Sequence, residues 1–259
     1  MKLPAAVPAR HVGAATLDKG LALLAKVVRD RGLTPLSTIA AEMGLAPSTA
    51  RRLVAALDRH GLVARGERGR YLAGGALIEL GCMHDRRGLI IGVSRAPLRQ
   101  LARTLGATTH LGVFETDMVT YIVKESVSAH SVFTRELQQL EAYCSGIGKV
   151  LLAHLDERAR EDYLEAGSFV ALTSRTIIDP ARLREELARV FEQGYAIDDG
   201  EIAPDLYCLA VPVKDVSGTV FAAISVSYHS GLRNMSLLHV LSRLRASATA
   251  ISKRLGRFV

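Results

Sequence analysis

The chain has 259 residues, of which 49% are hydrophobic and 23% are charged, so it is long enough for two domains with a sizeable core. Its net charge of +7 is concentrated at one end: residues 1–75 contain 12 basic and 5 acidic residues, whereas residues 76–259 contain 21 of each. This asymmetry indicates a polyanionic partner for the first third alone. The alternative is a basic surface that is merely solvated.

Other protein classes are excluded by what the sequence lacks. It has no apolar run of 18 residues and no apolar region typical of a secretory signal. Cys82, Cys144 and Cys208 are widely spaced and form no C-x-x-C pair, so neither a disulfide framework nor a zinc ribbon is supported. We therefore expect a cytoplasmic protein without a membrane partner, in which the Ala- and Pro-rich residues 1–14 form a disordered leader.

Residues 15–75 predict three short helices followed by a hairpin. A first helix is expected from about 17 to 30, capped by Thr16. Its inward-facing stripe is expected to consist of Leu17, Leu21, Leu24 and Val28. A second helix is expected from about 37 to 43, where Gly44 ends it.

The third helix has two contrasting sides. It begins at Pro47, where a missing N–H is harmless, and ends at Gly61. The side expected to face the core carries Ala50, Leu53, Val54 and Leu57. The opposite side is small, hydroxylated and cationic, with Ser48, Arg52, Ala55 and Arg59 flanked by Thr49 and Arg51. Arginine can pair with base edges in a major groove and hydroxyl groups can bind phosphates, so this pattern is typical of a DNA-recognition helix.

A basic hairpin follows, with strands expected at 62–64 and 71–73 and a Glu-Arg-Gly tip. Arg65, Arg68 and Arg70 cluster on it. Three helices followed by a basic hairpin predict a winged helix-turn-helix DNA-binding domain over residues 15–75. We expect these arginines to contact the DNA backbone or the minor groove, and plain solubilising charge is the alternative.

The rest of the chain predicts a linker helix over 76–90 and a mixed helix-and-sheet domain over 91–259, so the fold class is α+β. Strands are expected at 109–115, 119–125, 194–200, 207–213 and 219–228. Helices are expected near 91–105, 147–165, 180–193 and 235–256. A domain of this kind and size is typical of a small-molecule sensor.

The chain resembles the IclR family of bacterial transcriptional regulators over nearly its whole length. In the first third the resemblance lies in LSTIAAEMGLAPSTARRL and RYLAGGALIELG. Later it lies in CSGIGKVLLAHL (144–155), LTSRTIIDP (172–180), ARVFEQGYAIDDGE (188–201) and CLAVPVKDVSG (208–218).

The resemblance implies a C-terminal domain with a GAF-like fold that holds a small organic or aromatic acid. The pocket positions that it implies are Gly146, Ile147, Asp198, Cys208, Ser225 and Ser227. It also implies a homodimer or homotetramer that binds double-stranded DNA at a palindromic promoter site, most commonly as a repressor.

The chemistry of these residues partly supports the implied pocket. Gly146 lies at the start of an expected helix, where unpaired N–H groups favour a carboxylate. Ser225 and Ser227 are two residues apart on one strand and share a face, although ordinary sheet residues facing water are the alternative. A carboxylate such as Asp198 beside a bound anion is unfavourable unless a ligand hydroxyl, a proton or a water lies between them. Asp198 therefore favours a hydroxy, keto-hydrate or phenolic acid.

The identity of the ligand does not transfer from the family, because residues 126–143 depart from its pattern, with Glu141 where a proline is common. Catalysis has little support: GIGK at 146–149 lacks the spacing of a phosphate loop. Cys208 has no local partner that orients it as a nucleophile toward His110, His130 or His154.

No cofactor motif and no metal-ligand spacing is present. We therefore expect a non-enzymatic, ligand-controlled transcription factor. The alternatives are a transcriptional activator, an RNA-binding winged helix, and a hydrolase with a basic accessory domain.

Overall fold

The computed structural model describes residues 15–82, 85–127, 132–229 and 236–256, and the chain divides into two compact units, Met1–Asp85 and Arg86–Val259. The expected leader and His130 lie outside the described residues. The expected linker range 76–90 covers most of one helix in the first unit and the start of another in the second.

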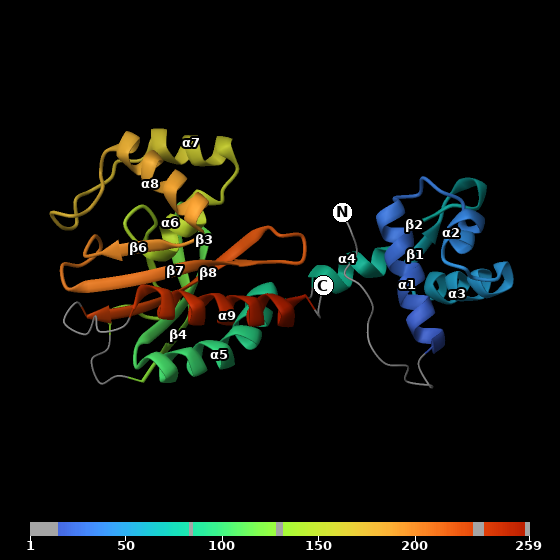
Figure 1. The fold of residues 1–259 in the computed structure, drawn as a ribbon. Helices are drawn as coiled ribbons and strands as arrows, with labels where there is room; N and C mark the ends of the chain where they lie inside the picture. Colours follow the sequence, from blue (N-terminus) through green and yellow to red (C-terminus); the bar gives the residue numbers. More distant parts are fainter. Residues whose placement is uncertain (1–14, 83–84, 128–131, 230–235, 257–259) are drawn as a thin grey trace. The chain divides into compact units, whose positions relative to one another are not determined.

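The first unit is built on three helices and a hairpin (Figure 1). The helices are α1 (Ala15–Asp30), α2 (Leu36–Glu42) and α3 (Pro47–Arg59). The hairpin consists of β1 (Val63–Arg65) and β2 (Tyr71–Ala73), joined by a short 3-10 turn at Glu67–Gly69, and α4 (Gly75–Cys82) follows it. The expected elements are confirmed to within two residues. Thr16 lies inside α1, which already includes Ala15, so the prediction that Thr16 caps this helix is wrong.

Two glycines fix the junction between α3 and the hairpin. Gly61 adopts φ of +65°, a left-handed conformation that favours glycine, directly after the helix ends. Gly74, which follows β2, packs against the backbone of Gly61: a Cβ at Gly74 would lie 2.0 Å from the Gly61 carbonyl oxygen. The absence of side chains at both positions therefore lets the hairpin close tightly on the end of α3.

The buried side of α1 differs from the prediction. Leu17 and Leu21 are 63% and 52% exposed, and Val28 is exposed as well. The buried residues are Gly20, Leu23 and Val27. A Cβ at Gly20 would lie 3.7 Å from Leu53 Cδ2, so α1 packs on α3 through the side that lacks a side chain there. Of the four residues predicted to face inward, Leu24 is half-buried and packs against the core, whereas the prediction is wrong for Leu17, Leu21 and Val28, which form an exposed apolar stripe.

The second unit contains a six-stranded antiparallel sheet in the order β5-β4-β3-β8-β7-β6. The strands are β3 (Thr108–Glu115), β4 (Met118–Ser126), β5 (Gln139–Glu141), β6 (Ala196–Asp199), β7 (Leu206–Lys214) and β8 (Val220–His229). All five expected strands are confirmed, whereas β5 was not expected. Three residues without a strong alternating pattern give β5 too weak a signal in the sequence.

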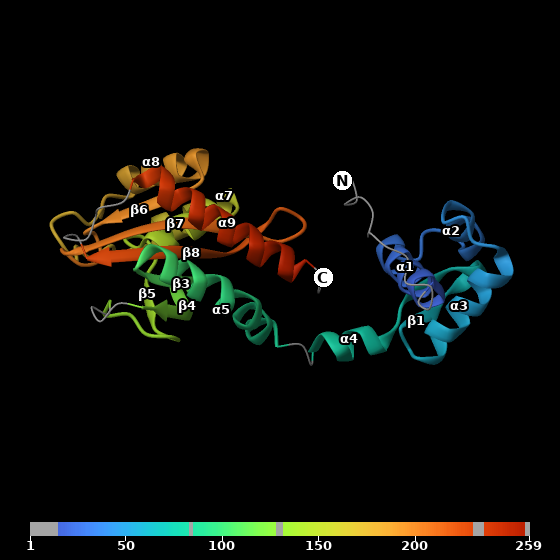
Figure 2. The same cartoon turned by 60° about the horizontal axis from the view of Figure 1, so that its bottom comes forward.

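Helices cover both faces of this sheet (Figures 1 and 2). One face packs against α5 (Arg86–Leu105) and α9 (Leu237–Leu255), which lie side by side. The other face packs against α6 (Gly146–Ala153), with α7 (Glu157–Ala166) and α8 (Pro180–Gln193) beyond it. The helix expected over 147–165 is thus two helices. They separate because Asp156 caps α7 instead of continuing α6: its Oδ1 accepts from the Ala159 N–H at 2.9 Å.

The alternation along the central strands assigns each side chain to one face. On β7 and β8, Leu209, Val211, Ile224 and Val226 belong to the core under α5 and α9. The residues between them face the α6 side, where Ala210 and Ala223 join a second core. Every polar candidate on these two strands lies on that second side.

Candidate functional site

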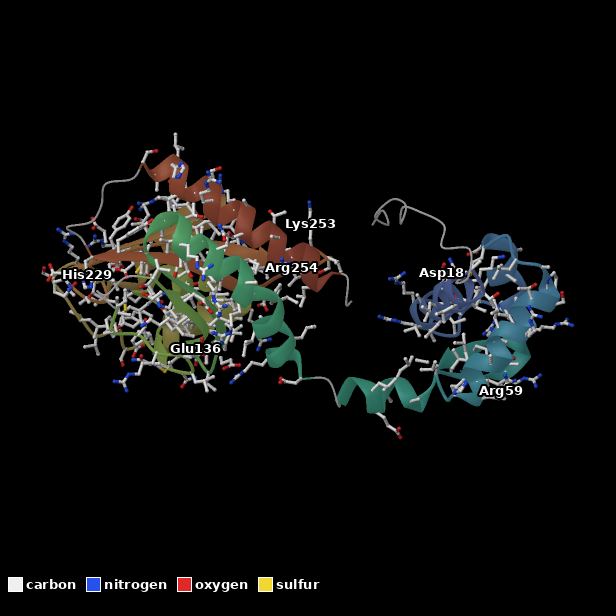
Figure 3. All side chains as sticks on the ribbon, turned by 90° about the horizontal axis from the view of Figure 1, so that it is seen from below. Asp18, Arg59, Glu136, His229, Lys253 and Arg254 are labelled. Carbon is white, nitrogen blue, oxygen red and sulfur yellow. The ribbon has the colours of Figure 1, made fainter. Side chains whose placement is uncertain are left out.

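The exposed side of α3 is the first candidate surface. Ala50, Leu53, Val54 and Leu57 are buried as expected. Ser48, Arg51, Arg52 and Arg59 are exposed, and Thr49 is half-buried. Figure 3 shows Arg59 at the surface of this unit. Ala46, which precedes α3, provides no side-chain cap, so within the described structure no capping side chain accepts from the first-turn N–H groups of this helix.

The hairpin brings its own arginines to the same side of this unit. Arg65 and Arg68 are exposed, and Arg68 adopts a left-handed φ of +53° at the tip. A groove of about 430 Å³ runs between the start of α3 and the hairpin, and Arg51, Arg65 and Arg68 line it. None of the described residues that line the groove is acidic. Its charge therefore suits an anion such as a phosphodiester.

Arg70 behaves differently from the other predicted contacts. It is half-buried, and its Nε is buried without a hydrogen-bond partner among the described residues. Part of this guanidinium thus packs inside the first unit, and Arg70 offers less of its charge to a partner than Arg65 and Arg68 do.

The second candidate site lies on the α6 side of the sheet. The register places Asp198, Cys208 and Ser227 directly beside one another on β6, β7 and β8. Ser225 lies one step along the same face, opposite Ala210. All four side chains are buried, so the structure brings the predicted pocket residues on the sheet together.

The start of α6 lies over these residues. A Cβ at Gly146 would come 3.4 Å from the Cβ of Ala210 and 3.6 Å from the Cβ of Cys208, so the absence of a side chain allows this close approach. The side chain of Ile147 packs elsewhere, over Gly112 in the core between α6 and the sheet. Ile147 can therefore contribute its backbone N–H to the site, but not its side chain.

Asp198 is the polar centre of this site. Its side chain is fully buried, and its Oδ1 accepts from the Glu201 N–H at 2.8 Å and from the Ile202 N–H at 3.4 Å. Its Oδ2 is buried without a hydrogen-bond partner among the described residues. Burial raises the pKa of Asp198 to about 7, since the charged form loses its hydration there.

His110, which sequence considerations raised only as a possible base for Cys208, lies in this site as well. Its Nδ1 lies 3.5 Å from both Ser225 Oγ and Ser227 Oγ, and its Nε2 lies 2.7 Å from Thr134 Oγ1. Burial, reinforced by the charge of Lys124, lowers the pKa of His110 to about 3, so the imidazole is neutral. The signal in the sequence was the alternation of side chains along β3. It places His110 on the same face of the sheet as Ser225, the residue directly opposite it on β8.

Cys208 has the properties of a structural thiol. Its Sγ lies 3.2 Å from Ser227 Oγ, and burial raises the pKa of the thiol well above its ordinary value. A thiol of this kind stays protonated and does not act as a nucleophile. The described residues contain no cluster of three side chains suited to holding a metal ion.

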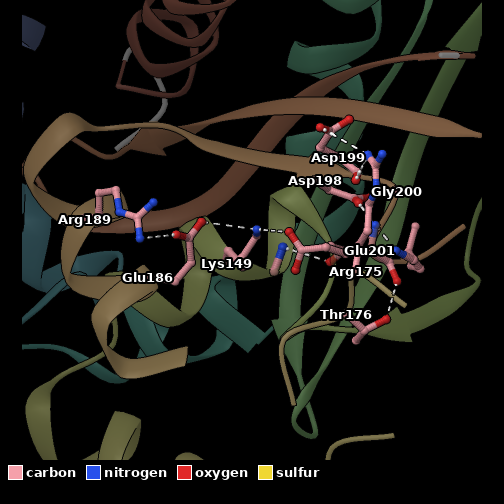
Figure 4. Close-up of polar contacts among 12 residues, drawn as sticks. Lys149, Arg175, Thr176, Glu186, Arg189, Asp198, Asp199, Gly200 and Glu201 are labelled. Carbon is pink, nitrogen blue, oxygen red and sulfur yellow. Dashed lines mark hydrogen bonds and ion pairs between the residues drawn. The ribbon is translucent and has the colours of Figure 1, made fainter. Parts of the chain in front are cut away.

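A buried ion-pair cluster adjoins Asp198 (Figure 4). Lys149 of α6 is 1% exposed, and its Nζ contacts Glu201 Oε1 and, at 3.3 Å, Glu186 Oε1 of α8. Arg189 pairs with the other oxygen of Glu186 at 3.2 Å. Sequence reasoning considered Lys149 only as part of the GIGK segment and missed this role, because its acidic partners lie 37 and 52 residues further along the chain.

Known protein families account for both units. Residues 84–253 match the model of the bacterial transcriptional regulator IclR C-terminal domain, and residues 16–67 match that of the IclR helix-turn-helix domain. The chain belongs to the IclR family of bacterial transcriptional regulators.

Individual relatives in this family cover most of the chain. XynR, an HTH-type transcriptional regulator of Escherichia coli strain K12, is 34% identical over 214 residues, which are 81% of this chain and 84% of XynR. The transcriptional repressor IclR of the same strain is 30% identical over 216 residues, with coverage of 82% and 79%. A solved IclR homologue from Microbacterium hydrocarbonoxydans, in complex with 4-hydroxybenzoate, is 26% identical with a TM-score of 0.61 and covers 93% of this chain and 98% of its own.

Several expectations are thereby confirmed. This IclR-family chain is a DNA-binding transcriptional regulator with a C-terminal effector-binding domain, and its family consists of regulators, not enzymes. Its fold is the expected winged helix-turn-helix followed by a GAF-like α/β domain. Within the described parts of the chain, no helix is both long enough and apolar enough to cross a membrane.

Proposed function

We propose that this chain is a repressor whose hold on its promoter is changed by a small hydroxyl-bearing organic or aromatic acid bound in the second unit. The observation that carries the proposal is the convergence of Asp198, Cys208, Ser225 and Ser227 on one buried face under the start of α6. We assign DNA binding to residues 15–75, the linker to 76–90 and effector binding to 91–259. The repressor assignment is supported by the relative named transcriptional repressor IclR.

In the DNA-binding part, α3 enters a major groove. Arg52 and Arg59 project from the side opposite the buried stripe, together with Ser48 and Thr49, and these residues contact base edges and phosphates. Their exposure on the described first unit supports this assignment, and so does the excess of basic residues in the first third of the chain.

Arg51 has a different role from Arg52. It lines the groove between α3 and the hairpin with Arg65 and Arg68, so these three guanidinium groups hold one stretch of the DNA backbone. Arg70 supports the hairpin at its base, with part of its guanidinium packed inside the unit.

In the effector-binding part, the acid carries two kinds of polar group. Its carboxylate takes the N–H groups of Gly146 and Ile147 and the hydroxyl groups of Ser225 and Ser227. Its hydroxyl donates to Oδ2 of Asp198, a buried oxygen that has no partner among the described residues. The homologue solved with 4-hydroxybenzoate, a phenolic acid, supports this class of ligand.

The functional form is a homodimer or homotetramer. The exposed stripe of Leu17, Leu21 and Val28 on α1 supports self-association, since apolar side chains aligned on one helix side commonly mark an interface. Ile78 and Leu80 of α4 are 71% and 58% exposed and add to the apolar surface of this unit. A two-fold arrangement of winged helices matches a palindromic site read in two half-sites.

The test is equilibrium binding of the full-length protein to a labelled duplex from the intergenic region beside its own gene, measured by fluorescence anisotropy. We expect tight binding to this duplex and weak binding to a scrambled duplex of equal length. Adding 4-hydroxybenzoate, glycolate or lactate in turn should identify an acid class that shifts the Kd about 5- to 150-fold, the usual range of allosteric coupling.

Equal affinity for the scrambled duplex would overturn the DNA-binding assignment. Competition with duplex RNA of the same sequence tests the RNA-binding alternative. If no acid of the panel changes the Kd for DNA, the result contradicts the proposed effector class.

A further inference from the structure

Lys149 is more deeply buried than a surface ion pair requires. It lies one turn after Gly146 on α6, the helix whose start covers the candidate effector site, and its side chain is 1% exposed. Its ammonium joins three separate parts of the unit: α6 itself, Glu201 in the turn after β6, and Glu186 on α8 (Figure 4).

Glu201 links this ammonium to the effector site. Its backbone N–H donates to Asp198 Oδ1 at 2.8 Å, while its side chain is held by Lys149. Its carbonyl oxygen accepts from Thr176 Oγ1 at 2.7 Å and from Thr173 Oγ1 at 3.3 Å. The peptide groups on both sides of Glu201 are therefore fixed, and they determine which oxygen of Asp198 is occupied.

Stability alone is a poor explanation for this buried pair. Removing two charges from water carries a large desolvation penalty, and replacing a buried ion pair with neutral residues of similar size is often neutral or stabilising. The location of the pair gives a better explanation. Lys149 holds the turn that contains Glu201, and the backbone N–H groups of this turn donate to Asp198 Oδ1. The other oxygen, Oδ2, has no partner among the described residues.

We propose that Lys149 is a positioning residue of the effector site, which anchors Glu201 on α6 so that the Glu201 N–H occupies Asp198 Oδ1 and Oδ2 is presented to the ligand. This inference rests on the proposed function, because it assumes that an acid binds beside Asp198. Lys149 itself does not touch the ligand.

The decisive variant replaces both partners by neutral residues of similar size, Lys149→Met with Glu201→Gln, so that no unpaired charge is left buried. The matched control is Arg184→Met with Glu161→Gln, which removes an ion pair of 2.6 Å between α8 and α7 in the same helical layer. A second control, Glu186→Gln, removes the other partner of Lys149 but leaves its contact with Glu201.

Three quantities are measured on each full-length protein: the Kd for 4-hydroxybenzoate, glycolate and lactate by calorimetry, the melting temperature, and the amide resonance of residue 201 by NMR. In the double variant at 149 and 201 we expect about 10- to 100-fold weaker binding of whichever acid the wild type binds. This is the effect of losing one hydrogen bond between the ligand and the carboxylate of Asp198. We also expect the amide resonance of residue 201 to move upfield. Both control variants should bind the acid as the wild type does.

Unchanged affinity in a folded double variant would overturn the role of Lys149. Equal losses in the two ion-pair variants would do the same, because they would show a general effect of the helical layer. If the wild type binds none of the three acids, the proposed effector class fails, and the amide resonance in the free protein still decides on Lys149: an unchanged shift in the double variant contradicts the inference.

Discussion

The Nε2 of His110 lies 2.7 Å from Thr134 Oγ1, so a hydrogen bond joins strand β3 to the segment between β4 and β5. On its other side the same imidazole faces Ser225 and Ser227. Each nitrogen of a neutral imidazole either donates or accepts, so one buried ring sets the direction of hydrogen bonds to two serines that we assign to the ligand. A charged imidazole could not accept at either nitrogen, and the arrangement therefore depends on the ring staying neutral.

Acid should destabilise the protein through His110. The pKa of this group is about 3 in the folded chain against an ordinary value of 6.5, so the unfolded chain binds more protons between these values. The contribution of His110 is thus complete above pH 6.5 and is lost as the pH falls toward 3. Urea unfolding at pH 7.5 and pH 5 should show less acid sensitivity in His110→Gln than in the wild type. The exposed His239→Gln variant is the control, and equal acid sensitivity in all three proteins would contradict the assignment.

Asp198 should have the opposite effect on stability. Its pKa is about 7 in the folded chain against 3.8 ordinarily, so its contribution is complete below pH 3.8 and is lost as the pH rises through 7. Asp198→Asn keeps an oxygen for the Glu201 N–H but does not titrate. The decline in unfolding free energy between pH 5 and pH 8 should therefore be smaller in this variant than in the wild type. An equal decline in the two proteins would mean that the carboxyl is charged throughout this range and would contradict the assignment.

The two serines should serve the ligand and not the DNA. Replacing Ser225 and Ser227 by alanine removes two hydroxyl groups from the α6 side of the sheet, far along the chain from α3. We expect promoter DNA to bind within about twofold of wild type, while the acid needed for half-maximal response rises more than tenfold. The control is the double variant Thr104→Ala with Thr249→Ala, whose hydroxyl groups, among the described residues, donate to carbonyl oxygens of their own helices. An unchanged response in the serine variant removes this pair from the pocket.

What the sequence revealed depended on the range of the interactions involved. The buried stripe of α3 follows a strict helical period, and the Ser225–Ser227 face follows the period of a strand, so both were predictable from local spacing. The same method failed for α1. A glycine adds nothing to a hydrophobic pattern, yet the missing side chain of Gly20 decides which side of α1 packs on Leu53. Lys149 and its partner Glu201 are 52 residues apart, and no local pattern joins them. Contacts of this kind become visible only when the fold is known.

Arg52 and Arg51 should respond differently to substitution. Arg52 projects from the exposed side of α3, so Arg52→Ala should weaken binding by about 1–3 kcal/mol and relax the preference at one base pair if it contacts a guanine. Arg51 lines the groove beside the hairpin, so Arg51→Ala should weaken binding equally on all sequences and lower the salt slope of log Kd by about 1. Competition binding on single-base variants of the site, repeated at several salt concentrations, separates the two. Identical profiles for both variants would contradict the division of roles.

Self-association should depend on the exposed stripe of α1. Leu17 and Leu21 are largely exposed in the described structure, so Leu17→Ser with Leu21→Ser should leave the fold of the first unit intact while it removes apolar contact area between subunits. Sedimentation analysis should then show a smaller assembly, and affinity for a two-half-site duplex should fall about 100-fold, because each winged helix must bind without its linked neighbour. Leu33→Ser is the matched control, since Leu33 is 75% exposed in the same unit but lies outside the stripe. If the α1 variant sediments as the wild type does and binds both half-sites as tightly, the subunits associate through another surface.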